Sequence, residues 1–226
     1  MTWVIDNFAQ IWRLTMDHVW LSIPPILLGF VIAVPLGWLA HRFRLSRGVL
    51  LTICGILYAI PSLPLFVLLP AILGTQILNP LNVVVALTGY AVALMVRTAA
   101  DAFDAVSPGV RQSATAVGFS AWGRFWKVEL PLAGPVLLAG VRVVSASTIS
   151  LVSVGALVGV TSLGYFFTDG YNRAFPTEIL VGIVGTIVIA VVFDIVLVVA
   201  GRLLLPWSRL MDGRAARVAR RAVATA

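Results

Sequence analysis

The chain has 226 residues, of which 60% are hydrophobic and 11% are charged. A soluble domain carries about a quarter charged residues, so this chain has too few charges to cover a water-exposed surface. We therefore expect an integral membrane protein. The net charge of +7 comes almost entirely from arginine, which in a membrane protein marks the cytoplasmic helix ends, and we expect no nucleic acid partner. The single cysteine, Cys54, excludes an internal disulfide and a thiolate metal cluster, and we expect no cofactor and no metal.

The N-terminal segment, residues 1–18, has apolar residues at spacings that could place them on one helix face. Such a helix would lie on the outer membrane surface, where aromatic rings are favoured, and we expect an external amphipathic lead-in. An ordinary connecting segment fits the pattern equally well. The residues concerned are Trp3, Phe8, Ile11 and Trp12.

Five stretches come close to the roughly 20 apolar residues that a spanning helix needs. The uncharged run 48–96 is too long for one helix and contains a turn-rich stretch at 74–80, so it predicts two spans. The transmembrane domain is expected over 19–205, followed by a basic cytoplasmic tail, 206–226. The predicted spans are 19–40, 49–73, 81–100, 134–160 and 179–205.

The distribution of basic residues predicts the orientation. If the N-terminus is outside, fourteen of the 16 Lys and Arg residues lie on inner segments or near inner helix ends, and only Arg13 and Arg173 lie outside. Cytoplasmic loops carry the excess of Lys and Arg. We therefore expect an all-α integral membrane fold with about five transmembrane helices, N-out and C-in.

The longest inner loop, residues 101–131, begins with the signals of a short helix. Ser107 followed by Pro108 is typical of a helix N-terminus. Residues 110–117 are then expected to be helical, with small side chains that allow a partner to approach closely. Gly118 can end this helix in the left-handed conformation.

A second short helix is expected from Ser120, which can cap it, through Lys127. Pro131 is expected to end this helix and to open the fourth span. Its aromatic residues follow helical spacing and can anchor it against the rest of the protein. They are Phe119, Trp122, Phe125 and Trp126.

This loop resembles the cytoplasmic coupling loop of the permeases of ATP-binding cassette (ABC) importers. The family pattern is Glu-Ala-Ala, three residues, Gly, nine residues, an apolar residue, one residue, and Leu-Pro. The resemblance implies a fold like that of type I ABC importer permeases, with a coupling helix, Gln112 through Phe119, that docks on a cytoplasmic ATPase. The residues at the motif positions are Gln112, Ser113 and Ala114, then Gly118, Val128, Leu130 and Pro131, and Gln112 replaces the family's glutamate.

Among importer permeases the chain most resembles those for osmoprotectants: glycine betaine, choline, carnitine and proline betaine. The similarity extends over most of residues 15–200 and implies the same substrate class. The residues that carry it are Asp17-His18, Val34–Gly37, Ile60–Leu63, Tyr90, Arg97, Glu129–Pro135 and Ala139–Arg142.

The resemblance also implies the partners and the location. They are a dimer of ATP-binding cassette subunits in the cytoplasm, a second permease subunit, either a copy of this chain or a related one, and an extracytoplasmic substrate-binding protein. The chain would span the bilayer of a bacterial plasma membrane. It contains no Gly-x-x-x-x-Gly-Lys-Ser/Thr phosphate loop, so we expect a transport subunit and not an enzyme.

Two charged residues lie within predicted spans, Asp194 in the fifth and Arg142 in the fourth. Charges at such depths usually pair with one another or face water. One interpretation is that Asp194 lines the substrate path or holds a gate. The other, which we favour, is a structural ion pair, with Arg142 as the partner.

Three other functions fit parts of the sequence. A permease of the same kind for another small solute, such as an amino acid, would share every feature of the loop. A gradient-driven secondary carrier predicts internal repeats and broken helices at a midplane site, and the sequence shows neither clearly. A membrane scaffold that recruits cytoplasmic partners would not require the coupling motif.

Overall fold

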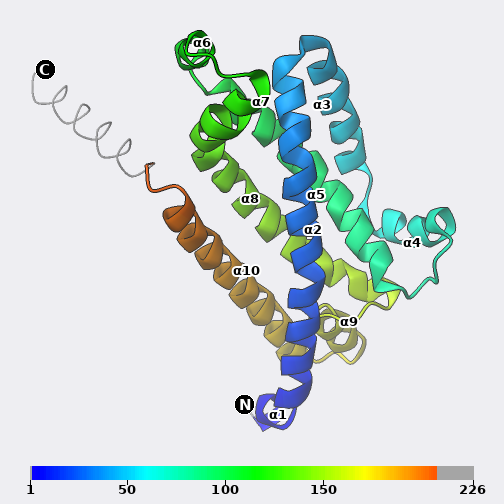
Figure 1. Cartoon of the computed structure of the whole chain (residues 1–226). Coiled ribbons are helices and arrows are strands. Elements are labelled where there is room, and N and C mark those ends of the chain that lie inside the picture. Colours follow the sequence, from blue (N-terminus) through cyan, green and yellow to red (C-terminus); the bar gives the residue numbers. More distant parts are fainter. Residues whose placement is uncertain (1, 208–226) are drawn as a thin grey trace, which may run out of the picture.

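The computed structural model describes residues 2–207, except for the side chains of residues 44–46. Within this range the chain forms helices and turns only (Figure 1). Most of the predicted tail, 206–226, lies outside the described residues. The helices are α1 (Thr2–Asp6), α2 (Phe8–Arg42), α3 (Arg44–Ala59), α4 (Ser62–Leu73), α5 (Pro80–Asp104), α6 (Pro108–Ala116), α7 (Ala121–Arg124), the π-helical turn η1 (Phe125–Glu129), α8 (Leu130–Val152), the 3-10 segment η2 (Ser153–Val158), α9 (Tyr165–Asn172) and α10 (Pro176–Leu204).

Four helical segments of the described chain are long and apolar enough to cross a membrane. A fifth span results if the bent pair formed by Arg47–Ala59 and Ser62–Leu73 counts as one. The prediction of an all-α protein with about five membrane helices is therefore confirmed. The four segments are Phe8–Arg42, Pro80–Asp104, Ala121–Val158 and Pro176–Leu204.

The predicted span 49–73 is not one straight helix, because α3 and α4 meet at an angle of 102°. The break lies at Ile60 and Pro61, which both have an extended backbone conformation. A proline has no N–H to donate and disfavours the helical conformation of the residue before it. Tyr90 of α5 donates its hydroxyl hydrogen to the Ile60 carbonyl at 2.7 Å. The carbonyl that the break leaves free is thus satisfied inside the protein.

The long helix α2 incorporates much of the segment predicted as a lead-in. It has 35 residues and begins at Phe8. Its length of roughly 50 Å exceeds the ~30 Å hydrocarbon core of a bilayer, so it extends beyond the core. The apolar residues predicted to share one face of the segment 1–18 do not all have the same surroundings. Trp3 packs edge-on against Phe166 and Phe175. Phe8 and Trp12 are exposed.

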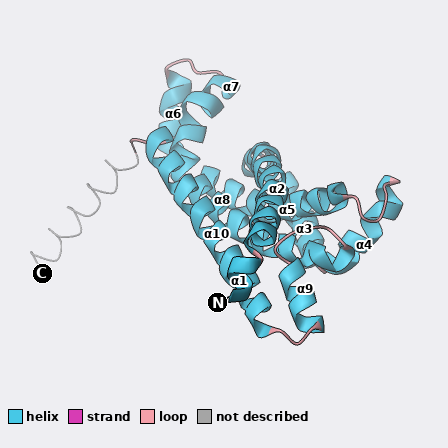
Figure 2. Cartoon of the chain, turned by 90° about the horizontal axis from the view of Figure 1, so that it is seen from below, coloured by secondary structure: helices cyan, strands magenta, loops and turns pink. Residues whose placement is uncertain are grey.

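Helix α5 lies at the centre and packs most closely against α2. Many of its residues are fully buried, and two glycines of α2 allow the backbones to approach. A Cβ on Gly29 would lie 2.5 Å from the Cβ of Ala91, and a Cβ on Gly37 would lie 2.4 Å from that of Ala99. Figure 2 shows α8 and α10 on one side of this pair and α3 and α4 on the other.

The last two spans have boundaries close to those predicted. The fourth, expected at 134–160, begins as α8 at Leu130, loses its α-helical form after Val152 and continues as η2. Gly159 ends η2 with a left-handed backbone, at φ 80°. The fifth, expected at 179–205, is α10.

Candidate functional site

Helix α6 carries the residues predicted to dock on a partner, and it lies at one end of the bundle together with α7 (Figure 1). None of its residues is buried. Gln112 and Ser113 are exposed and Ala114 is partly exposed, while Val117, just beyond the helix, is 79% exposed. The structure therefore places the Glu-Ala-Ala-like segment on a small surface helix that is free to contact another protein.

Gly118 and Ser120 act as the sequence predicted, whereas Ser107 stands at the N-cap position of α6 without a side-chain capping bond. Gly118 has a left-handed backbone, at φ 94°, and the amides of Gly118 and Phe119 donate to the carbonyls of Thr115 and Ala114. Such bonds close a helix C-terminus. The hydroxyl of Ser120 accepts from the amide of Gly123 at 3.1 Å and caps α7.

The second helix does not end at Pro131 as predicted. It continues from α7 through η1 into α8, and the amide of Leu130 donates to the carbonyl five residues earlier, on Phe125. The wider π-helical turn admits the proline without ending the helix, since a proline in an α-helix clashes with the carbonyl four residues before it. Single π-helical turns occur frequently at functional sites.

The motif residues thus divide between two places. Gln112, Ser113, Ala114, Gly118 and Phe119 belong to α6 and its C-terminal turn. Val128, Leu130 and Pro131 belong to η1 and the start of α8, where Leu130 packs against the main core and the carbonyl of Pro131 accepts from Nε1 of Trp207 at 3.2 Å. The structure does not bring the two groups into one contiguous site.

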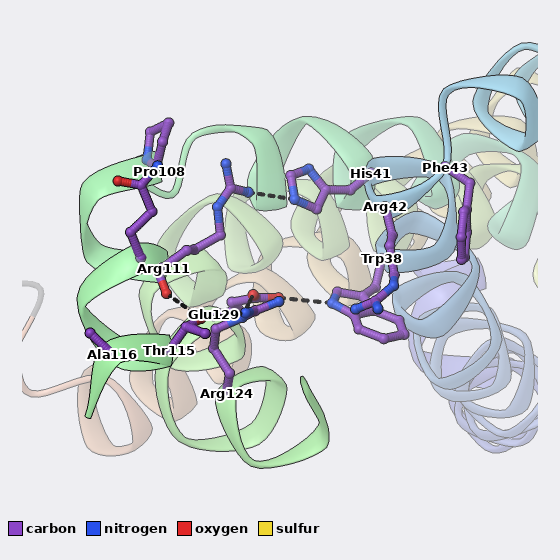
Figure 3. A pocket seen from close by; sticks show the side chains of 11 residues that line it. Trp38, His41, Arg42, Phe43, Pro108, Arg111, Thr115, Ala116, Arg124 and Glu129 are labelled. Carbon is purple, nitrogen blue, oxygen red and sulfur yellow. Dashed lines mark hydrogen bonds and ion pairs between the residues drawn. The ribbon is translucent and has the colours of Figure 1, made fainter. Parts of the chain in front are cut away.

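An open cavity of about 930 Å³ separates α6 from the C-terminal end of α2 (Figure 3). Arginine is the most frequent residue in its lining, so the cavity is basic. Its lining residues are Trp38, His41, Arg42, Phe43, Pro108, Arg111, Gln112, Thr115, Ala116, Arg124 and Glu129.

A buried carboxylate lies at the base of this cavity. Glu129 is 2% exposed; its Oε1 accepts from Nε of Arg124 at 2.7 Å and its Oε2 from Nε1 of Trp38 at 2.8 Å. The same Arg124 donates through a terminal nitrogen to Oγ1 of Thr115 on α6 at 2.8 Å. Hydrogen bonds therefore connect α6 to α2 by way of α7 and η1 (Figure 3).

A second polar connection runs from α6 to α2, α5 and α3. Arg111 contacts Nε2 of His41, and since a guanidinium can only donate, Nδ1 of His41 carries the ring hydrogen and donates to Asp104. Arg47 of α3 pairs with Asp104 and, at 2.9 Å, with Asp101. This network was not predicted from the sequence, although charges at the ends of three spans were a signal for it.

The two intramembrane charges pair with each other. Nε of Arg142 lies 2.6 Å from Oδ1 of Asp194, and a second guanidinium nitrogen lies 2.8 Å from Oδ2. The bond is bidentate, the strongest geometry for this pair, and it connects α8 to α10. The two side chains remain 42% and 43% exposed, so the chain alone does not cover them.

A further ionic group at the opposite end of the bundle was not predicted. Arg173 pairs with Asp169 of α9 at 3.0 Å and approaches Glu178 of α10 at 3.6 Å. The hydrogen bond to Asp169 raises the pKa of the Arg173 guanidinium. In the part of the chain that the structure describes, no three His, Cys, Asp or Glu residues form a group that could hold a metal ion.

The family model described as "Binding-protein-dependent transport system inner membrane component" matches residues 26–210. The chain belongs to this family. As a member it is a permease, the transport subunit of an ABC importer and not an enzyme, and the matched range includes the whole 101–131 loop, Arg142 and Asp194. The family description places its members in an inner membrane, in agreement with the several apolar helices of this permease.

Three curated relatives resemble the permease over most of their length. The glycine betaine/carnitine/choline transport system permease protein OpuCB of Bacillus subtilis is 28% identical, over 91% of this chain and 94% of the relative. The choline transport system permease protein OpuBB of the same organism is 30% identical, over 88% and 91%. The osmoprotectant import permease protein OsmW of Salmonella typhimurium is 29% identical, over 85% and 90%.

Solved structures have the same fold. An inward-facing structure of the MetNI methionine ABC transporter matches with a TM-score of 0.72 at 23% identity, over 88% of this chain and 96% of that one. An amino acid ABC transporter crystallised with histidines matches with a TM-score of 0.72 at 14% identity, over 88% and 96%. The fold is therefore that of a type I importer permease.

Proposed function

We propose that this permease imports osmoprotectants, such as glycine betaine, choline or carnitine, across a bacterial plasma membrane. The support comes from three relatives named for these solutes, each similar over at least 85% of this chain. The sequence motifs that resemble osmoprotectant permeases point to the same substrate class, among them the Ile60–Leu63 segment at the α3–α4 break and its partner Tyr90.

The observation that carries the coupling role is the exposure of α6. A short helix without a buried residue contributes little to the core, so its closed C-terminus and its small side chains suit a docking element. We assign the docking surface to Gln112 through Phe119, with Val117 as its most exposed large apolar side chain. It would fit in a cleft on a cytoplasmic ATPase, and ATP binding would then favour one arrangement of the spans.

The partners follow from this role. We propose a dimer of ATP-binding cassette subunits at the α6 end, a second permease subunit beside this one, and an external binding protein at the α9 end. This places the N-terminus outside and the C-terminus inside, as the excess of Lys and Arg on the inner segments indicates.

For the two intramembrane charges we propose a structural role. The bidentate Arg142–Asp194 pair holds α8 to α10, and neither charge is left alone in the apolar span. Because both side chains are still partly exposed, the second permease subunit or a water-filled path beside it would cover the pair.

The test is uptake of radiolabelled glycine betaine, choline and carnitine into vesicles that contain the permease with its ATPase and binding protein. Gly118→Asp places a charge at a left-handed position of the docking loop that has open space around it. Gly74→Asp is the matched control, because Gly74 is also left-handed with nothing within 4 Å but lies between α4 and α5. We expect ATP-dependent uptake that Gly118→Asp abolishes, with loss of the co-purifying ATPase, and that Gly74→Asp retains.

Other outcomes would revise the proposal. Uptake that persists without ATP or an ATPase would identify a secondary carrier. ATP-dependent transport of another solute, such as an amino acid, with no uptake of the three osmoprotectants would retain the importer and reject the substrate class.

A further inference from the structure

Helix α6 is held to the membrane helices mainly by polar contacts. It buries no side chain, so packing of apolar residues does not fix its position. Among the described residues, its side-chain bonds to other elements are the one that Thr115 accepts from Arg124 and the one between Arg111 and His41. Any movement of α6 therefore reaches the membrane helices through these bonds and through the chain segments on either side of it.

Through Arg124, the bond at Thr115 leads to the buried carboxylate of Glu129, a group that the stability of the fold does not by itself require. The Glu129 carboxylate is almost completely buried and uses one oxygen for Arg124 and the other for Trp38. A buried ion pair is weak support for stability, since apolar residues of similar size often replace it without loss. A buried pair with both oxygens satisfied does fix the relative positions of the groups that it joins.

The π-helical turn η1 positions this carboxylate. Phe125 and Glu129, at its two ends, are its buried residues. The Phe125 ring packs edge-on against the Trp38 ring, with 5.2 Å between centroids. The indole of Trp38 is thus held through its ring by Phe125 and through its N–H by Glu129.

Both polar connections of α6 end on one face of α2. Trp38 and His41 are three residues apart and therefore lie on the same side of the helix. Gly37, the residue directly before Trp38, packs against the backbone of α5. A displacement of this end of α2 would therefore move α5 with it.

We propose that Thr115, Arg124, Glu129 and Trp38, which we name the Glu129 clamp, transmit the movement of α6 to the first span. Arg124 and Glu129 are positioning residues that act through α6 and α2. The clamp makes α6, η1 and the end of α2 one rigid unit, so that closure of the ATPases rotates α2 and α5 together. This inference rests on the proposed ABC importer function.

The test measures ATP hydrolysis and glycine betaine uptake in the same assembled transporter, with the ATPase and the binding protein present. Thr115→Val removes the hydroxyl that accepts from Arg124. Trp38→Phe keeps the ring packing and removes the N–H. Glu129→Gln keeps the size and shape of the side chain, but an amide has one acceptor oxygen where the carboxylate has two. Either Arg124 or Trp38 then points its N–H at an NH₂ group and loses its hydrogen bond.

Matched controls exist in the same chain. Thr186→Val removes a partly buried hydroxyl that donates to Gly182 within its own helix α10. Trp20→Phe removes an indole that is 70% exposed. Both controls are expected to consume the wild-type amount of ATP for each glycine betaine that is transported.

We expect each clamp variant to co-purify with the ATPase and to hydrolyse ATP, and to consume roughly three- to tenfold more ATP per glycine betaine, the factor that corresponds to one hydrogen bond. If the clamp variants assemble in smaller amounts while ATP per glycine betaine stays at the wild-type value, the clamp is only structural and the inference is wrong. Wild-type transporter that takes up no solute in an ATP-dependent manner would instead reject the proposed function itself.

Discussion

Gly37 of α2 lies so close to Ala99 of α5 that a Cβ on the glycine would be 2.4 Å from the Ala99 Cβ and 2.8 Å from the amide nitrogen of Ala100. One of these atoms belongs to the backbone, so a side-chain rotation cannot relieve the overlap. Small residues at such crossings allow membrane helices to pack closely where the hydrophobic effect does not drive association.

Gly37→Ala should therefore destabilise the permease by about 1–3 kcal/mol, the usual cost of overpacking a core. The measurement is thermal unfolding of the purified protein in detergent. Gly55→Ala is the control, since a Cβ at Gly55 in α3 meets nothing within 4 Å and alanine favours the helix. An equal melting temperature for Gly37→Ala and wild type would contradict the close packing of α2 against α5.

The Arg142–Asp194 pair predicts a specific pattern among single and double variants. Asp194→Asn leaves the Arg142 guanidinium without its counter-ion inside a span, and we expect lower expression and a lower melting temperature. The double variant Arg142→Leu with Asp194→Leu removes both charges and should recover most of the loss, because an ion pair and an apolar pair often have similar stability.

The same variants separate the structural role from a role in the substrate path. Glycine betaine uptake by the stable double variant would agree with a structural pair. If that variant folds and assembles as well as wild type but transports nothing, the charges act in the path or in a gate.

Tyr90→Phe tests the break between α3 and α4. The variant removes the hydroxyl that donates to the Ile60 carbonyl at 2.7 Å and leaves that carbonyl without this partner. We expect a loss of about 1–3 kcal/mol in the free energy of unfolding. Tyr171→Phe, at a side chain that is 79% exposed, is the control and should unfold at the wild-type temperature. If the two variants have the same stability, the hydrogen bond from Tyr90 to Ile60 does not stabilise the bend between α3 and α4.

Much of the fold could be predicted from local sequence. The lengths of the apolar runs predicted the spans, and the left-handed turn at Gly118 and the Ser120 cap followed from single residues whose conformations depend on their near neighbours. The 102° angle between α3 and α4 could not be predicted in this way. Pro61 permits a break, but the angle depends on packing against α5, where Tyr90 bonds to Ile60 from 30 residues further along the chain.

The contacts around Glu129 could not be predicted from local sequence either. Glu129 was visible only as part of a Leu-Pro motif, because its partner Trp38 lies 91 residues away on α2, and Arg124 lies five residues before it, a spacing that the π-helical turn brings together. No periodicity indicates a π-helical turn that buries a carboxylate. The Arg142–Asp194 pair was predicted as one of two interpretations, since two opposite charges inside neighbouring spans leave few alternatives.

Gln112 stands where the family pattern has glutamate, and it lines the cavity together with Arg42, Arg111 and Arg124. A carboxylate at this position would face positive charges, so Gln112→Glu should retain both ATPase binding and uptake. Gln112→Lys adds a like charge beside the arginines and should weaken co-purification of the ATPase by roughly two- to fivefold, the range of exposed charge pairs. This loss of ATPase co-purification should be larger at low salt than at high salt, because ions screen exposed charges. Equal binding of the Glu and Lys variants at low salt would mean that the basic cavity does not influence the docking helix.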